Sequence, residues 1–222
     1  MNRELVRARI EEIGIIPSVR VSSADYARYA CEALNRHGIP IAEITMTVPG
    51  GIEAIAHAAK TLPHMIVGAG TVLDADTAQR CLDAGAKFLT SPGLVAEVVE
   101  FALRHSVVVF PGALTPTEVI AAWKTGADFV KIFPCAPVGN HHYIRSLKVP
   151  FPQIRLIASG GVNQHTAASF IQAGASALGI GNELIPHEAL QRRQEEQIQE
   201  LSRRFLHIVK QTRQQMAARQ SS

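Results

Sequence analysis

The stretch LDAGAKF (residues 82–88) shows how this chain is organised. A helix-like run ends at a glycine, and a short apolar segment follows at once. The same ending recurs in NRHG (residues 35–38), KTGADF (residues 124–129) and QAGASAL (residues 172–178). Glycine is the expected residue just past a helix, because it adopts the left-handed conformation at little steric cost. The recurrence predicts helices that alternate with short strands.

The alternation extends along most of the chain. Eight segments are predicted as strands, at residues 15–20, 40–47, 65–71, 87–92, 107–111, 128–133, 154–159 and 176–181. The clearest helices between them are predicted at residues 23–36, 52–61, 74–84, 95–105, 115–125 and 164–173. This pattern predicts an α/β protein with the (β/α)8 TIM-barrel fold. A doubly wound open sheet is the alternative, but no clear GxGxxG opens the first helix.

The chain is expected to form one domain over residues 1–222, with the barrel over about residues 12–186. A long helix is expected after it, over about residues 188–217. Apolar residues recur there at intervals of three and four, which predicts a stripe that docks on the barrel: Ile198, Leu201, Phe205, Ile208 and Val209.

Composition limits the possible partners and compartments. The chain has 222 residues, of which 47% are hydrophobic and 18% charged, as in ordinary globular proteins. Residues 191–222 carry seven Lys/Arg and three Asp/Glu, a net charge of +4, whereas the rest of the chain is −1, which argues against a nucleic-acid partner. No targeting segment and no membrane span are expected. The three cysteines are isolated, which predicts neither a disulfide framework nor a zinc site and fits a reducing cytoplasm.

A lysine in the segment DFVKIFPCAP (residues 128–137) is the first candidate functional residue. Side chains alternate along a strand, so Phe129, Lys131 and Phe133 share one side, and Val130 and Ile132 share the other. A buried ammonium is costly unless it is paired. A lysine in such a place is often only a strand-end residue that reaches water.

The same alternation places polar side chains on the inward side of other strands. Glu43 opposes the apolar Ala42 and Ile44, and both faces of a parallel barrel strand are covered, which argues against a solvent-exposed glutamate. The inward set is expected near the C-terminal ends of the strands, where barrel enzymes carry their active sites: Arg20, Glu43, Thr45, Thr71, Lys131, Phe133 and Ser159. A structural ion pair between Glu43 and Lys131 is the alternative to a catalytic site.

These residue types suit one chemistry in particular. Burial disfavours the charged form of a lysine, and a neutral amine can attack a ketone to give a Schiff base. A nearby carboxylate can then move the protons. Lys131 as nucleophile and Glu43 as acid and base are sufficient for a metal-free aldolase that needs no cofactor.

Two glycine loops predict a phosphate site. IASGGVN (residues 157–163) and LGIGN (residues 178–182) end the last two predicted strands. Loops at these places, with free backbone N–H groups, commonly bind phosphate in this fold. Simple tight turns are the alternative explanation. The candidate phosphate-binding residues are Gly160, Gly161, Gly181 and Asn182.

Taken together, six motifs resemble the 2-keto-3-deoxy-6-phosphogluconate (KDPG) / 4-hydroxy-2-oxoglutarate (KHG) aldolase family over residues 5–187. They are AEITMT, IVGAGTVLD, FLTSPGL, PGALTPTE, FVKIFP and ASGGV, in this order. The resemblance implies a class I, Schiff-base (β/α)8 aldolase that uses no metal and forms a homotrimer. It implies that Lys131 forms the Schiff base and that Glu43 moves protons through a bound water.

The resemblance also implies which residues contact the substrate. Thr71 matches a residue near the pyruvoyl carboxylate, and Arg20 matches a first-strand arginine that lines the pocket. Pro92 and Phe133 match pocket walls. Gly160, Gly161 and Asn182 match the phosphate site.

The chain departs from the family pattern at three positions near the expected site. The family commonly reads E-x-T-x-R, whereas Thr47 stands here in place of the arginine, which removes a bidentate clamp for the substrate carboxylate. Arg20 could supply that charge. Ser159 replaces a common threonine, and Asn182 a common serine.

The expected reaction is cleavage of a 2-keto-3-deoxy-4-hydroxy acid to pyruvate and an aldehyde. KDPG, which gives glyceraldehyde 3-phosphate, is favoured over KHG, which gives glyoxylate. A phosphate-binding barrel isomerase or synthase with Glu43 as its base is one rival. A sugar-phosphate binder without catalysis is another.

Overall fold

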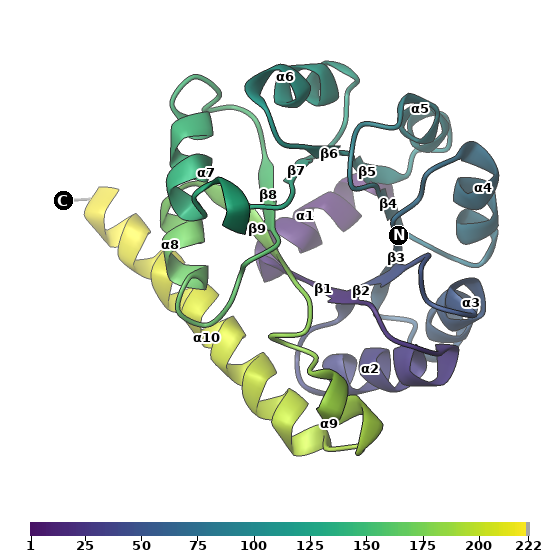
Figure 1. Ribbon diagram of the computed structural model, residues 1–222. Helices are drawn as coiled ribbons and strands as arrows, with labels where there is room; N and C mark the ends of the chain where they lie inside the picture. The colour runs from purple at the N-terminus through teal and green to yellow at the C-terminus, as the bar shows by residue number, and fades with distance from the viewer. Residues whose placement is uncertain (221–222) are drawn as a thin grey trace.

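The computed structural model describes residues 1–220 and forms a parallel β-barrel surrounded by helices (Figure 1). Within these residues the strands hydrogen-bond in the order β5-β4-β3-β2-β1-β9-β8-β7-β6, and every pair is parallel. Their bounds are β1 Ile15–Val19, β2 Ile41–Thr45, β3 Ile66–Gly70, β4 Phe88–Thr90, β5 Val108–Phe110, β6 Gly112–Ala113, β7 Val130–Ile132, β8 Leu156–Ser159 and β9 Ala175–Ile180. The predicted barrel fold is confirmed.

Within the described residues there are nine strands where eight were predicted, because Pro111 interrupts one of them. β5 pairs with β4, and β6 pairs with β7, so the two segments occupy one place in the ring and close it. Proline has no N–H to donate to a neighbouring strand, and a break in the ladder is expected there. The Pro111 carbonyl still accepts a hydrogen bond from the Lys131 N–H at 2.9 Å. One predicted strand therefore becomes two short ones without a change of topology.

Helices cover the outside of the barrel, as the sequence predicts. Their bounds are α1 Arg3–Ile13, α2 Ala24–Arg36, α3 Gly51–Thr61, α4 Ala75–Asp83, α5 Ala96–Arg104, α6 Pro116–Lys124, α7 His141–Lys148, α8 Ala167–Gln172, α9 His187–Gln191 and α10 Glu195–Gln220. The Thr115 and Glu118 side chains form the reciprocal cap of α6. Helix α7 and the 3-10 turn Ala136–Val138 lie in a segment without a predicted helix. None of these helices, within residues 1–220, is long and apolar enough to cross a membrane.

The predicted C-terminal helix is present, but it is not continuous over residues 188–217. The structure has the short helix α9, then a break, and then α10, which runs beside α8 and α2 (Figure 1). Arg193 lies in the break with a left-handed φ of 54°. Its guanidinium pairs with Asp25 at 2.6 Å and lies 4.6 Å from the centre of the Tyr29 ring. Contacts to α2 therefore accompany a turn that local sequence does not signal.

Aromatic side chains fill the interior of the barrel beneath Lys131. Phe88 and Phe110 stack with ring centres 5.1 Å apart, and Phe129 meets Phe110 edge-on at 6.0 Å. Gly68 leaves room for this layer, because a Cβ there would lie 2.4 Å from the Phe88 ring. Phe129 precedes Lys131 by two residues on the same side of the chain, so this aromatic layer lies beneath Lys131.

Helix α1 crosses the N-terminal end of the barrel and contacts β5 and β9 (Figure 1). The Arg3 guanidinium pairs with the buried Asp128 carboxylate at 3.0 Å. Asp128 also accepts a hydrogen bond from the Val109 backbone N–H at 3.0 Å. One carboxylate, just before β7, thus joins the helix to β5 at this end, and the opposite end stays open.

Candidate active site

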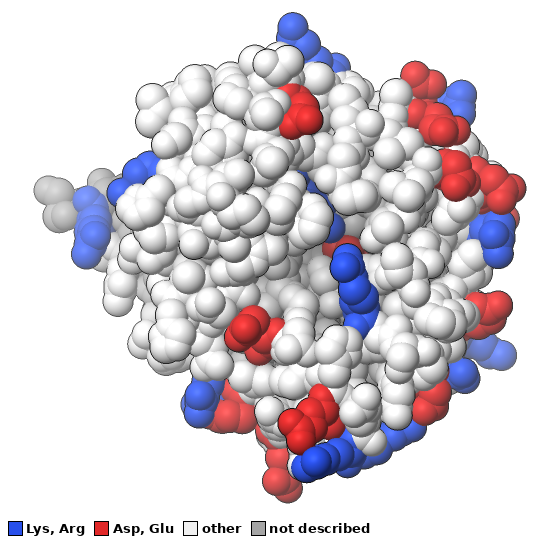
Figure 2. All heavy atoms as spheres, viewed as in Figure 1, with Lys and Arg blue, Asp and Glu red and all other residues white. Residues whose placement is uncertain are grey.

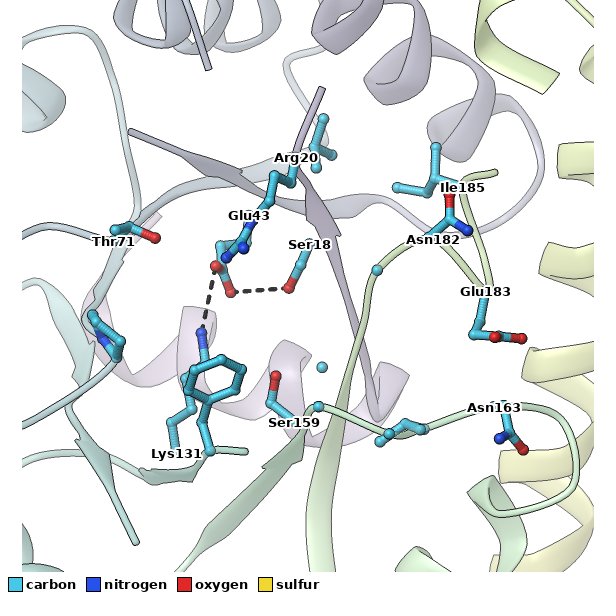
Figure 3. Close-up of a pocket in the computed structure, with 18 of the residues that line it drawn as sticks. Ser18, Arg20, Glu43, Thr71, Lys131, Ser159, Asn163, Asn182, Glu183 and Ile185 are labelled. Atoms are coloured by element: carbon cyan, nitrogen blue, oxygen red, sulfur yellow. Dashed lines mark hydrogen bonds and ion pairs between the residues drawn. The ribbon is translucent and has the colours of Figure 1, made fainter. Parts of the chain in front are cut away.

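Lys131 and Glu43 face each other inside the barrel, as side-chain alternation predicts. Lys131 lies on β7 and Glu43 on β2, and their Nζ and Oε1 atoms are 3.5 Å apart (Figure 3). Their side chains are 10% and 3% exposed. A buried amine beside a buried carboxylate is the arrangement in which proton transfer between the two, or to a bound molecule, needs no bulk water.

The Glu43 carboxylate is held on two sides. Gly70, opposite Thr45 on the neighbouring strand β3, leaves the space that the carboxylate occupies, since a Cβ there would lie 2.1 Å from Oε1. The Ser18 hydroxyl donates to the other oxygen, Oε2, at 3.4 Å. Ser18 and Glu43 are register partners on β1 and β2. One carboxylate oxygen is therefore left facing Lys131.

Lys131 combines a polar side chain with apolar surroundings. Val130 and Ile132 are fully buried on the opposite side of the strand. The Lys131 ammonium lies 5.7 Å from the centre of the Phe133 ring, within the range of a cation–π interaction. The amine end points into the open end of the barrel, where Glu43 meets it (Figure 3).

These two residues lie at the base of a cavity of about 370 Å³. Figure 2 shows this end of the barrel as a largely uncharged face with a central hollow, in which basic and acidic side chains are visible. The residues that line the cavity are Ser18, Val19, Arg20, Val21, Glu43, Thr71, Pro92, Lys131, Phe133, Ser159, Gly160, Gly161, Val162, Asn163, Gly179, Gly181, Asn182, Glu183, Ile185 and His187. The cavity has the size and mixed character of a small-molecule site.

Most of the site residues predicted from the sequence meet in this cavity. Besides Lys131 and Glu43, the lining includes Arg20, Thr71, Pro92, Phe133, Ser159, Gly160, Gly161, Gly181 and Asn182. Their placement fits the predicted site, and their individual roles stay predictions.

Thr47 is the predicted site residue that does not line the cavity. Its side chain is exposed, and its hydroxyl lies 2.8 Å from the Thr45 hydroxyl. Thr45 is buried and lies outside the lining, with its hydroxyl 3.5 Å from the Val19 carbonyl. The chain turns after β2, and this turn carries residue 47 away from the inward side that strict alternation assigns to it.

Thr71 enters the cavity from an unusual backbone conformation. Its φ is 59°, in the left-handed region that β-branched residues rarely adopt, at a cost of about 1–3 kcal/mol. The Val72 N–H donates to the Thr90 carbonyl at 3.1 Å and fixes the chain just after this position. The conformation directs the Thr71 side chain into the cavity, toward Glu43 (Figure 3).

The glycine loop after β8 is held against the loop after β7. The Cys135 N–H donates to the Ser159 carbonyl and the Ala136 N–H donates to the Gly160 carbonyl, both at 2.9 Å. A Cβ on Gly161 would lie 2.5 Å from the Ala136 Cβ, and the Gly161 φ is 99°. Glycine is therefore required at residue 161 by both space and conformation.

Sequence reasoning missed several polar residues of the cavity. Ser18 shares its side of β1 with Arg20, so side-chain parity could have indicated it. Asn163 and Glu183 lie in loops beyond the strand ends and His187 begins α9, so strand alternation gives no signal for them. Among the described residues, no group of three or more His, Cys, Asp or Glu is placed to hold a metal ion.

Fold and site together define a class of protein. A parallel (β/α)8 barrel that carries an amine and a carboxylate at the C-terminal end of its strands is a barrel enzyme with its active site in the usual place. Comparison with known proteins identifies the family within this class.

The family profile described as KDPG and KHG aldolase matches residues 6–201. The chain is 31% identical over 209 residues to a 2-dehydro-3-deoxy-phosphogluconate aldolase of Pseudomonas aeruginosa, over 92% of this chain and 95% of that protein. It is 30% identical over 190 residues to the KHG/KDPG aldolase of Escherichia coli K12, over 85% of this chain and 89% of that protein.

A solved structure gives the same result. The KDPG aldolase of Legionella pneumophila, with pyruvate captured as a covalent carbinolamine intermediate, superposes with a TM-score of 0.81 and 26% identity, over 88% of this chain and 95% of that one. This chain belongs to the KDPG and KHG aldolase family, and as a member of it is an enzyme of the aldehyde-lyase class.

Proposed function

We propose that this chain is a class I aldolase that cleaves a 2-keto-3-deoxy-4-hydroxy acid to pyruvate and an aldehyde. The observation that carries the proposal is the buried pair of Lys131 and Glu43, 3.5 Å apart at the base of the cavity. The captured pyruvate in the Legionella pneumophila relative supports covalent chemistry.

The reaction begins at Lys131. Its neutral amine adds to the C2 ketone, and loss of water from the resulting carbinolamine gives an iminium ion. Glu43, through a water, takes the C4 hydroxyl proton as the C3–C4 bond breaks. The electron pair of that bond moves to the iminium nitrogen and gives an enamine, while C4 leaves as the aldehyde.

The second half of the reaction regenerates the enzyme. Glu43 returns its proton, through water, to C3 of the enamine and restores an iminium ion. Water then adds at C2, the C–N bond breaks, and pyruvate is released with Lys131 as a free amine. The two halves of the reaction together need no oxidant and no reductant.

The remaining cavity residues orient the substrate in this proposal. Arg20 supplies the positive charge for the keto-acid carboxylate, and the Thr71 hydroxyl lies on the same side of the cavity (Figure 3). Pro92 and Phe133 form apolar walls. The backbone of the two glycine loops offers N–H donors to the far end of the substrate.

KDPG is the first substrate to test, because glycine-loop residues that could bind a phosphate line the cavity. KHG is the second. The Pseudomonas aeruginosa relative carries the name of the first activity, and the Escherichia coli relative carries both.

Trapping the Schiff base tests the function directly. The protein is mixed with pyruvate and borohydride, its intact mass is measured, and the adduct is located by peptide mapping. We expect one reduced pyruvate adduct, on Lys131. Lys131→Arg keeps the positive charge but cannot form the imine, so it should give no adduct. Lys87→Arg, on an exposed lysine outside the cavity, is the matched control and should react normally.

A folded wild-type protein without an adduct would overturn the Schiff-base mechanism. It would leave Lys131 as a structural charge and favour a barrel enzyme with Glu43 as its base. An adduct that persists in Lys131→Arg would assign the chemistry to another lysine.

We also propose a homotrimer in the cytoplasm. The trimer rests on the family resemblance, and the compartment on three buried cysteines that form no disulfide within residues 1–220. With a chain mass of 24.0 kDa, a trimer would have a mass of about 72 kDa in light scattering after gel filtration. A mass near that of a single chain would overturn the trimer.

A further inference from the structure

The outer end of the cavity is polar and carries an acidic residue. Asn163 comes from the loop after β8, Asn182 and Glu183 come from the loop after β9 (Figure 3), and His187 begins α9. All four line the same cavity as Lys131. This end lies between the glycine loops, where the far end of a keto acid bound to Lys131 would reach.

The two asparagine side chains have their oxygens occupied by the backbone. Asn163 Oδ1 accepts hydrogen bonds from the N–H groups of His165 at 2.9 Å and Thr166 at 3.0 Å. Asn182 Oδ1 accepts one from the His187 N–H at 3.0 Å. Each amide therefore keeps its NH2 group as a hydrogen-bond donor, and both residues line the cavity.

Glu183 supplies the opposite property at the same place. It is exposed on the cavity side, and within residues 1–220 it makes no ion pair. A carboxylate accepts hydrogen bonds from hydroxyl groups and repels a second anion. Donors and an acceptor side by side fit the hydroxyl groups of a sugar chain.

The positive charges of the cavity lie elsewhere. Among the described lining residues, the lysine and arginine side chains are Lys131, 3.5 Å from Glu43, and Arg20, just beyond the end of β1. Lys131 is needed for the ketone, and Arg20 is the counter-charge for the keto-acid carboxylate. A phosphate at the outer end would meet hydrogen-bond donors, His187 and the Glu183 carboxylate, with no lysine or arginine left for it.

We propose that Glu183 is a specificity-determining residue that offsets the attraction of the glycine loops for phosphate. The enzyme then accepts non-phosphorylated 2-keto-3-deoxy sugar acids about as well as phosphorylated ones. This inference rests on the proposed aldolase function and adds the chemistry of the substrate's far end.

The test compares KDPG with its non-phosphorylated counterpart, 2-keto-3-deoxygluconate, in the wild type and in Glu183→Gln. In the wild type we expect values of kcat/KM for the two substrates within about tenfold of each other. Glu183→Gln removes the charge and keeps the shape, so it should raise kcat/KM for KDPG about tenfold and leave 2-keto-3-deoxygluconate nearly unchanged. Glu188→Gln, on an exposed glutamate outside the lining that pairs with Arg192, is the matched control and should change neither value.

Salt gives an independent readout. Higher ionic strength screens the repulsion between Glu183 and phosphate. The kcat/KM for KDPG divided by that for 2-keto-3-deoxygluconate should therefore rise with salt, and it should rise more in the wild type than in Glu183→Gln. A merely structural role of Glu183 would change both substrates alike and would not produce this difference.

Two results would overturn the inference while the aldolase function stands. One is a wild type that prefers KDPG by a hundredfold or more. The other is a Glu183→Gln protein with an unchanged ratio of the two substrates. Borohydride trapping of pyruvate on Lys131 separates these results from failure of the proposed function, because pyruvate does not reach the outer end. Loss of the trapped adduct itself would overturn both.

Discussion

Gly70→Ala tests the role of the Glu43 carboxylate by adding a single methyl group to the neighbouring strand. A Cβ at residue 70 would lie 2.1 Å from Glu43 Oε1 and 2.6 Å from its Cδ, whereas ordinary contact begins near 3.4 Å. The carboxylate must therefore move by more than about 1 Å. Oε1 is the oxygen that faces Lys131 at 3.5 Å, so this movement displaces the proposed acid and base from the atoms at which it would act.

The expected loss follows from that displacement. A shift of about 1 Å in a catalytic group can cost about a hundredfold in rate, and general acid–base catalysis contributes about 10²–10⁴-fold. We expect kcat to fall by at least about a hundredfold, measured as pyruvate release in a coupled NADH assay. Overpacking costs about 1–3 kcal/mol of stability, so thermal melting should still show a folded protein.

Two further variants make the test specific. A Cβ on Gly93 would have no neighbour within 4 Å, so Gly93→Ala is the control and should keep full activity. Glu43→Gln should lose activity on its own, and adding Gly70→Ala to it should cost little more, because both changes act on one carboxylate. A folded Gly70→Ala protein with wild-type kcat would refute the assignment of Glu43 as acid and base.

The remaining predictions concern Ser18, Asp128 and the thiols. Ser18→Ala removes the hydrogen bond to Glu43 Oε2, so kcat should fall about three- to tenfold at unchanged KM; a pure KM effect in steady-state kinetics would contradict a positioning role. Asp128→Ala leaves the Val109 N–H and the Arg3 guanidinium without their partner, so urea unfolding should show a loss of about 2–4 kcal/mol. Burial raises the pKa of the thiols, so a thiol reagent at pH 8 should react quickly only after unfolding, and its rate on the folded protein should rise as the pH approaches 11; fast reaction at pH 8 would contradict this burial. The pKa is raised to about 12 for Cys31 and to about 11 for Cys81 and Cys135.

The period of two along each strand explains why much of the site could be predicted. Glu43 and Lys131 are far apart in the sequence, yet each opposes apolar neighbours on its own strand, and a closed barrel has one interior. Knowing which side of its strand each of the two residues occupies is therefore enough to place both in the interior of the barrel. The same reasoning fails one turn beyond the strand: Thr47 follows the end of β2 at Thr45, and the chain no longer alternates there.

Features that depend on contacts between distant elements could not be predicted. The break before α10 involves Arg193, whose partners Asp25 and Tyr29 lie on α2. The local sequence around residue 193 is polar and suits a continuous helix, so only the packing reveals the turn. The polar outer end of the cavity is similar, because Glu183 and Asn163 line one cavity only once the loops after β8 and β9 are placed by the fold.

Thr47 stands where the family pattern has an arginine, and the order of the strands shows how the cavity can still have a positive charge. β1 and β2 are neighbours, and Ser18 lies opposite Glu43, so residue 20 follows the same register just beyond the end of β1. Arg20 lines the cavity from there, whereas Thr47 points its hydroxyl at Thr45. A positive charge that the family pattern places on the second strand can thus reach the same cavity from the first. In the proposed reaction Lys131 holds the ketone from β7, and we expect Arg20, which the family pattern also has on the first strand, to hold the carboxylate without the second arginine.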